Sequence, residues 1–472
     1  MTSAISIGKQ DFASLRENHY FYVDKTDFIR QWWESGDDIT LITRPRRFGK
    51  TLNMSMLNCF FSRQYAEKGT IFEGLSIWKQ EKYRRLQGTY PVIFLSFADV
   101  KQNNYQDAVQ KIKNIIVDAY RQHRYLEQEE CFTQNEKQQM LEITEKMSDV
   151  TAQDALKNLS SYLNLLYGKK VLIFLDEYDT PMQEAYIHGY WDEFVGFMRS
   201  LFNATFKTNP YLERAVMTGI TRISKESVFS DLNNLTVITT TSDAYADCFG
   251  FTEEEVFQSL DQFGMPEKKD LVKQWYDGFC FGTHRDIYNP WSITNYLKEK
   301  KLRPYWAATS SNGLISKLLH SASVNMKEEL EKLINRQQIV VNFDEQIIFG
   351  QLEQDESAVW SLLVASGYLK VEEIEYRGLT LEPWYSLSIT NLETVSMFSN
   401  MFKSWFAAAS ANYNEFIKAL LNGDVKAMNL YMNDIALATF SNFDAGKHAS
   451  ERSQPERFYH GFVLGLLVEL ID

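Results

Sequence analysis

The sequence predicts an α/β fold in which a parallel β-sheet carries a phosphate-binding loop at the end of its first strand. Two segments support this prediction. Residues 39–57 (ITLITRPRRFGKTLNMSML) join an apolar, β-branched strand to a helical pattern. Residues 171–180 (VLIFLDEYDT) are a run of five apolar residues followed by acidic ones. Strands this apolar are typical of a parallel sheet that is covered by helices on both faces.

The first segment contains RPRRFGKT, a Walker A sequence in all but one position. Arg44 stands where the pattern G-x-x-x-x-G-K-[ST] has its first glycine, so the match rests on Gly49, Lys50 and Thr51. Gly49 lets the main chain approach the phosphates, because it has no side chain in the way. We expect Lys50 to reach the β- and γ-phosphates and the Thr51 hydroxyl to be a ligand of Mg²⁺.

The second segment places Asp176 and Glu177 at the carboxyl end of a buried strand, where ligands of open α/β sheets bind. We expect Asp176 to hold Mg²⁺ through a water molecule. Glu177 would orient and deprotonate the water that attacks the γ-phosphate. The alternative is a solvated acidic turn at the end of a strand, which Lys50 upstream in a strand–loop–helix context disfavours.

A further buried strand is predicted in residues 90–100, between the two motif strands in sequence. Such a strand defines the additional-strand type of P-loop NTPase, a three-layer fold with a parallel sheet, in which ATPases with a catalytic glutamate occur. This agrees with the role proposed for Glu177. Residues 21–35 predict an amphipathic helix whose aromatic side chains either wall the adenine or cover the sheet, and both alternatives stay open.

A strand around residues 215–217 ends in Thr218, which is placed to contact the γ-phosphate or the attacking water. Arg222 follows closely, and a guanidinium there is suited to stabilising charge on the transferring phosphoryl group. The alternative is that Arg222 pairs with Glu226 or Asp231.

Composition sets limits on partners and location. The chain has 472 residues and a net charge of −13, which argues against tight nonspecific binding of nucleic acid by the chain as a whole. The cysteines form no CxxC pair, so we expect four buried, reduced thiols in a cytoplasmic protein. We expect neither a membrane-spanning helix nor a standard export signal, because no apolar stretch is long enough and the first residues lack a basic region.

The combination of FYVDKT, TRPRRFGKTL, LIFLDEYDTP, MTGITRISKESVFSDLNNL and WYDGFCFG resembles the AAA-ATPase-like family of bacterial proteins, relatives of archaeal-type and signal-transducing P-loop ATPases. The resemblance covers roughly residues 5–282, and an arginine in place of the first Walker A glycine belongs to the family's pattern. It implies ATP and Mg²⁺ as cofactors, with metal and water handled by Asp176 and Glu177. The implied nucleotide-binding residues are Arg44, Pro45, Arg46, Arg47, Phe48, Gly49, Lys50, Thr51 and Leu52, together with Thr218.

After a P-loop domain at residues 1–250, we expect an all-helical lid at 251–345 that leans over the nucleotide. Residues 346–404 have the helix–strand–turn–strand–helix order of a winged-helix module, and their excess of acidic residues favours protein contact over DNA binding. Residues 405–472 resemble the beginning of a PD-(D/E)XK nuclease domain. They lack the paired carboxylates and the E-x-K lysine of such a nuclease, so we expect an incomplete, inactive one.

The function that follows is slow, Mg²⁺-dependent hydrolysis of ATP that drives a conformational switch, in a DNA-related, defence or signalling process. Glu177, Lys50 and Arg222 are the expected catalytic residues. One alternative is a nucleotide-binding switch or scaffold that does not hydrolyse ATP. Another is an ATP-regulated nuclease truncated before its active site. A protein partner or self-association is expected, and binding of nucleic acid stays open.

Overall fold

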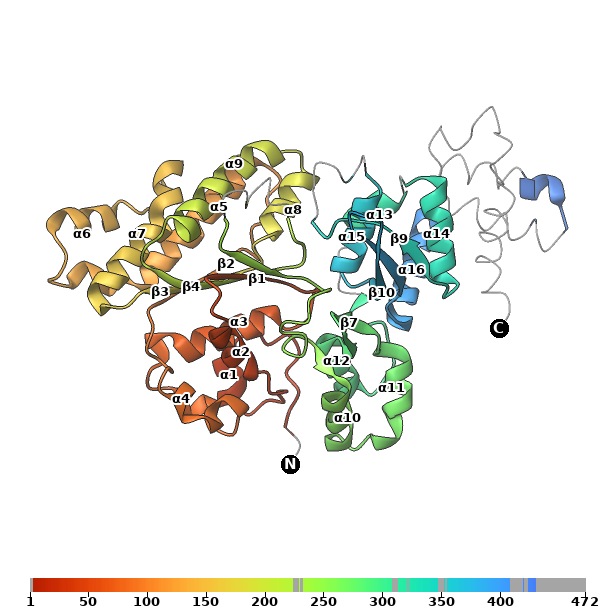
Figure 1. Ribbon diagram of the computed structural model, residues 1–472, viewed down its shortest axis with the longest axis horizontal. Coiled ribbons are helices and arrows are strands. Elements are labelled where there is room, and N and C mark those ends of the chain that lie inside the picture. Colours follow the sequence, from red (N-terminus) through yellow and green to blue (C-terminus); the bar gives the residue numbers. More distant parts are fainter. Residues whose placement is uncertain are drawn as a thin grey trace.

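Figure 1 shows the computed structural model of the chain. It describes residues 3–223, 229, 232–307, 313–320, 322–346, 352, 355–407, 419 and 423–429. A helix-covered sheet built from the first half of the chain lies beside a second group of helices and short strands built from residues 251–407.

Five parallel strands form the main sheet, in the order β2-β3-β4-β1-β5. They are β1 (Ile39–Thr43), β2 (Val92–Ser96), β3 (Val171–Asp176), β4 (Leu212–Gly219) and β5 (Leu235–Ile238). The strand between the two motif strands in space is β4, which pairs with β1 and β3, whereas β2 lies at the edge. The predicted α/β fold with a P-loop-type parallel sheet is confirmed.

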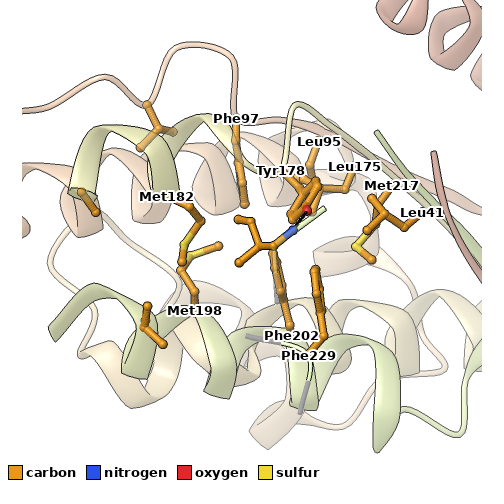
Figure 2. Close-up of a cluster of buried hydrophobic side chains, with 14 of the residues drawn as sticks. Leu41, Leu95, Phe97, Leu175, Tyr178, Met182, Met198, Phe202, Met217 and Phe229 are labelled. Carbon is orange, nitrogen blue, oxygen red and sulfur yellow. Dashed lines mark hydrogen bonds between the residues drawn. The ribbon is translucent and has the colours of Figure 1, made fainter. Parts of the chain in front are cut away.

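Helices cover both faces of this sheet (Figure 1). One layer contains α1 (Phe12–Glu17), α2 (Asp27–Ser35), α3 (Lys50–Phe61) and α4 (Glu81–Arg84). The other contains α5 (Tyr105–Gln122), α6 (Gln134–Leu141), α7 (Asp149–Tyr167), α8 (Thr180–Ile187) and α9 (Trp191–Phe202). Successive strand residues face opposite layers, so Phe174 packs towards α3 while Leu175 packs towards α8 and α9. Figure 2 shows the second side, where Leu41, Leu175 and Met217 lie in one cluster with Met182 and Met198.

The helix predicted in residues 21–35 is α2, and its aromatic side chains pack on the sheet. Phe28 and Trp32 are buried, and the Trp32 ring lies 5.7 Å from that of Phe174. Trp33 lies against Phe61, with their ring centroids 5.2 Å apart. This is the arrangement that a covering helix requires.

The segment expected to be an all-helical lid contains a small sheet, so that expectation was wrong in this respect. Helices α10 (Glu253–Gln262), α11 (Lys269–Tyr276) and α12 (Pro290–Glu299) accompany three short antiparallel strands. The strands are β6 (Phe251–Thr252), β7 (Phe279–Phe281) and β8 (His284–Tyr288). The tight turn at Gly282, with φ of 56°, folds β7 back onto β8. Asn289 caps α12, because its side-chain oxygen accepts from the amides of Trp291 and Ser292.

The remaining described residues form helices around a second three-stranded antiparallel sheet, in the order β10-β11-β9. The elements are α13 (Gly313–His320), α14 (Val324–Ile334), β9 (Ile339–Val341), α15 (Ser357–Ala365), β10 (Leu369–Arg377), β11 (Glu382–Ile389) and α16 (Leu392–Ala407). The order α15, β10, turn, β11, α16 is the one expected, and β9 joins the sheet from before residue 346. Most of residues 405–472, where we expect an incomplete nuclease fold, lie outside the described residues.

All four cysteines are unpaired. Cys59 and Cys248 are buried and Cys280 is half-buried, but Cys131 is exposed, so the expectation of four buried thiols was wrong for Cys131. The neighbouring Phe132 takes the inward position in that turn. Among the described residues, no helix combines the length and the apolar character needed to cross a membrane.

Candidate functional site

The segment predicted to bind phosphate, residues 44–49 and called the phosphate loop below, connects β1 to α3 at the carboxyl edge of the main sheet. Gly49 precedes α3 with φ of 81°, and Arg47 has φ of 67°. A side chain at Gly49 would be strained by this left-handed conformation, although nothing would obstruct it within 4 Å. The Phe48 side chain packs the loop against β7, with its ring centroid 4.7 Å from that of Phe279 and 5.4 Å from that of Phe281.

Lys50 is buried, and its ammonium group lies within the loop. Nζ donates to the carbonyl oxygens of Arg44 and Pro45, both at 2.8 Å. Burial lowers the pKa of Lys50, while the nearby carboxylates, Glu177 first, oppose that shift. A bound phosphate would offer the ammonium group charged oxygens in place of these two carbonyls, and charge-assisted hydrogen bonds are the stronger kind.

The Arg44 side chain points into the protein. Its guanidinium donates to the carbonyls of Thr239, at 2.5 Å, and Ala244, at 3.1 Å, and lies 4.4 Å from the ring centroid of Phe281. Burial lowers the pKa of Arg44 to about 9. The Arg44 side chain therefore holds the loop against the segment after β5. The main chain of Arg44, whose carbonyl oxygen accepts from Lys50, remains part of the loop.

The other loop residues contact the second half of the chain. The Arg46 carbonyl accepts from Asn289 Nδ2 at 3.3 Å, and the exposed Arg47 guanidinium lies 4.3 Å from the ring centroid of Trp291. Pro45 packs so closely on Gly367 that a Cβ there would come within 2.7 Å of Pro45 Cγ. The adjoining Leu52, in the first turn of α3, is half-buried against the core.

Asp176 joins three elements at the centre of the site. Its Oδ2 accepts from Thr51 Oγ1 at 2.8 Å and its Oδ1 from Thr218 Oγ1 at 2.5 Å. Asp176 and Thr218 are fully buried. Burial raises the pKa of Asp176, and these two hydrogen bonds oppose that rise. The structure therefore brings together Lys50, Thr51, Asp176 and Thr218, which are far apart in the sequence.

Glu177 follows in a strained backbone conformation, with φ of 53°. Its amide donates to Thr218 Oγ1 at 3.4 Å, and its carboxylate accepts from Thr180 Oγ1 at 3.1 Å. A left-handed backbone is unfavourable for a residue with a large side chain and persists only where the surrounding structure holds it. Residues of this kind are often found at functional sites.

Arg222 lies on the segment after β4 and lines a small cavity with Thr43, Glu345 and Ser361. Its Nε is buried without a hydrogen-bond partner. No hydrogen bond or ion pair joins Arg222 to another residue within the described ranges. Its suggested alternative partners, Glu226 and Asp231, lie outside those ranges.

Two residues of the acidic motif, Tyr178 and Asp179, were given no role from the sequence, although both are buried beside the site. Their place directly after the two acidic residues was the available signal. Their partners lie on the segment after β4, more than forty residues away, so sequence alone does not pair them.

Comparison with known proteins relates this part of the chain to a family of predicted ATPases. Residues 6–229, which include β1 to β4 and the site residues on them, match the family model AAA-ATPase_like, described as "Predicted AAA-ATPase". The chain is also similar to the "Uncharacterized protein in vnfD 5'region" of Azotobacter chroococcum mcd 1. The two are 27% identical over 395 residues, which is 82% of this chain and 68% of that protein. Residues 6–229 are thus AAA-ATPase-like in sequence, on an α/β fold of the P-loop type.

Proposed function

We propose that the chain binds ATP with Mg²⁺ at the carboxyl edge of the main sheet and hydrolyses it slowly to drive a conformational change. The observation that carries this proposal is the bridge from Thr51 through Asp176 to Thr218, next to the ammonium group of Lys50. A hydroxyl on the phosphate-loop helix, a carboxylate and a buried lysine form the minimal set for holding a nucleoside triphosphate.

The donors at this bridge suit Mg²⁺. Thr51 Oγ1 and Asp176 Oδ2 are hard oxygen atoms, and Mg²⁺ in nucleotide sites is held by few protein oxygens together with phosphates and water. When bound, the ion would neutralise charge on the phosphates. Asp176, whose burial disfavours a lone negative charge, would gain a cationic partner.

Hydrolysis needs a base beside the γ-phosphate, and we assign this role to Glu177. The hydrogen bonds from its amide to Thr218 and from Thr180 to its carboxylate hold it next to Asp176. There it would accept a proton from the attacking water. Arg222, whose Nε is buried without a partner, would stabilise negative charge on the transferring phosphoryl group.

The same contacts suggest how binding moves the rest of the chain. Phosphate binding would draw Lys50 away from the Pro45 carbonyl, and Pro45 packs directly on Gly367. Phe48 of the loop also contacts β7. We therefore assign the lid function to residues 251–345 and treat residues 346–404 as the module that responds to the nucleotide.

The test is to measure ATP affinity and phosphate release with the wild-type chain and with Lys50→Ala. We expect Lys50→Ala to lose at least about 100-fold in ATP affinity, since it removes the cation that faces the phosphates. Wild-type affinity in Lys50→Ala would refute the assignment of the loop. ATP binding without phosphate release by the wild-type chain would favour the alternative of a nucleotide-binding switch that does not hydrolyse ATP.

A further inference from the structure

Asp179 connects the loop after β3 to the segment after β4. Its Oδ2 accepts from the amides of Ile220, at 2.9 Å, and Thr221, at 2.8 Å, and from Thr221 Oγ1, at 2.7 Å. Gln183 Nε2, from the first turns of α8, donates to the same oxygen at 3.0 Å. Three of these four donors lie on the other segment, so the carboxylate works as a clamp between the two.

Tyr178 adds a second set of hydrogen bonds between the same segments. Its amide donates to the Thr218 carbonyl at 2.9 Å, and its hydroxyl donates to the Thr221 carbonyl at 2.7 Å. The hydroxyl also accepts from the Ile223 amide at 3.1 Å. Figure 2 shows Tyr178 in the apolar cluster close to Leu95 and Leu175, and its side chain is fully buried.

The two segments are in close contact at Gly219. A Cβ at this position would come within 2.6 Å of Tyr178 Cε1 and 2.7 Å of Asp179 Oδ1. Residues 218–223 are thereby held on one side by Tyr178 and Asp179. Arg222 lies between Thr221 and Ile223, both of which the clamp holds.

Asp179 carries a carboxylate at a position where burying a neutral acceptor, such as an amide, would cost less free energy. It is 1% exposed, and burial raises its pKa. The hydrogen bonds from Thr221 and Ile220 and the charge of Lys50 oppose that rise. An ionised carboxylate accepts stronger hydrogen bonds than an amide, which suits a group that must hold three donors of another segment at once.

We propose that Asp179, assisted by Tyr178, is a positioning residue that holds residues 218–223 so that Thr218 and Arg222 face the γ-phosphate. The clamp begins at the residue after Glu177, so it also restrains the left-handed backbone of that residue. This inference rests on the proposed function. It predicts that Asp179 controls the preference for ATP over ADP, because the γ-phosphate is the part of ATP that these residues would contact.

The experiment measures equilibrium binding of Mg–ATP and Mg–ADP to the full chain in a Glu177→Gln background, so that ATP is not consumed. We expect Asp179→Ala to lower the ratio of ATP to ADP affinity at least about fivefold while ADP affinity changes less than about twofold. Arg222→Ala should lower the ratio by a similar factor. The double substitution should do no more than the larger single one, since Asp179 acts through the Arg222 segment.

Gln183→Leu is the matched control. It removes a donor to the same Asp179 oxygen from α8 but leaves the link to residues 220 and 221 intact, so the ratio should not change. If Asp179→Ala fails to fold, Thr221→Val, which removes one donor and keeps the side-chain volume, should lower the ratio about two- to threefold.

Equal losses of ATP and ADP affinity in Asp179→Ala, or an unchanged ratio in a folded Asp179→Ala or Thr221→Val protein, would overturn the inference. Additive effects of the Asp179 and Arg222 substitutions would do the same. A failure of the proposed function would give different results. The Glu177→Gln parent would then bind neither nucleotide, or Lys50→Ala would bind both nucleotides as the parent does.

Discussion

At the scale of single residues, the site contains two carboxylates, those of Asp176 and Glu177, which are adjacent in sequence but have different surroundings. Asp176 is fully buried and receives two threonine hydroxyls, whereas Glu177 is half-buried in a left-handed backbone with one hydroxyl at its carboxylate. The first environment suits a group that holds a metal ion in place. In the proposed function, the second would leave Oε1 of Glu177, which has no hydrogen bond within the described part of the chain, to accept a proton from water.

Glu177→Gln tests this division of roles. The amide keeps the shape of the side chain but cannot accept a proton, so we expect ATP to remain bound and turnover to fall at least about 100-fold. Steady-state phosphate release together with ATP binding measures both quantities. Glu184→Gln, on the same helix α8, is the control and should turn over ATP as the wild type does. Turnover of Glu177→Gln within a few-fold of the wild type would show that Glu177 is not the base.

At the scale of helices and strands, the phosphate loop is held by side chains from distant segments. Arg44 illustrates this, because its guanidinium joins the end of β1 to carbonyls after β5. The buried Arg44 side chain fills space beside Phe281 that a glycine at this position would leave empty. The residue that departs from the Walker A pattern is thus a fixed part of the scaffold.

Arg44→Gly, which restores the usual pattern, should therefore destabilise the protein. It leaves the carbonyls of Thr239 and Ala244 without these donors and opens a cavity beside Phe281, so we expect a loss of about 3 kcal/mol in the free energy of unfolding. Denaturant unfolding measures it. Arg47→Ala, which removes an exposed guanidinium, should cost less than about 1 kcal/mol. A stability of Arg44→Gly equal to that of the wild type would contradict the scaffold role.

Sequence reasoning found the elements that have a strong local signal. Strands β1, β2 and β3 are apolar runs, and β1 and β3 lie next to the two motifs. In contrast, β5 and the strands around Gly282 were not predicted, because they are two to five residues long and mix apolar with polar residues.

The same limit applies to the site. The sequence motifs predicted the phosphate loop and the acidic pair, and the structure places Lys50, Thr51 and Asp176 together. The direction of the Arg44 side chain and the partners of Asp179 are contacts between segments far apart in the chain. No periodicity or spacing in the sequence encodes such contacts.

At the scale of the whole molecule, one hydrophobic core extends from the main sheet into the second half of the chain. Its aromatic rings form a continuous series from Phe48 to Phe279, Trp306 and Tyr368, with neighbouring centroids 4.7, 5.4 and 5.3 Å apart. Within the second half of the chain, polar contacts join α12 and the segment after it to α16. Glu393 of α16 is 1% exposed and accepts from Ser292 of α12 and from the Trp306 amide.

The contacts of Glu393 within the second half of the chain are expected to depend on pH. Burial raises its pKa to about 7 in the folded chain, whereas in the unfolded chain it returns to its ordinary value near 4.5. Between these values the folded state binds a proton that the unfolded state does not, so the stability contributed by this group is complete at low pH and is lost as the pH rises towards 7. Glu393→Gln, which mimics the protonated form, removes that dependence.

We therefore expect Glu393→Gln to gain stability relative to the wild type as the pH rises from about 4.5 to 7, by up to about 3 kcal/mol. Urea unfolding across this range measures the difference. Glu382→Gln, at an exposed position of β11, should show a difference that does not vary with pH. A constant difference for Glu393→Gln as well would mean that the carboxylate stays ionised in the folded chain.

The contact between Pro45 and Gly367 has a consequence for how the protein is made. The phosphate loop appears early in synthesis, but Phe279, Asn289, Trp291 and Gly367, which pack against it, leave the ribosome more than 200 residues later. A nascent chain that has emerged only as far as β5 contains all five strands of the main sheet but lacks the side chains of the second half that pack against the loop. In the proposed function, the nucleotide site would thus be completed late in translation, when the segments proposed to respond to the nucleotide are already present.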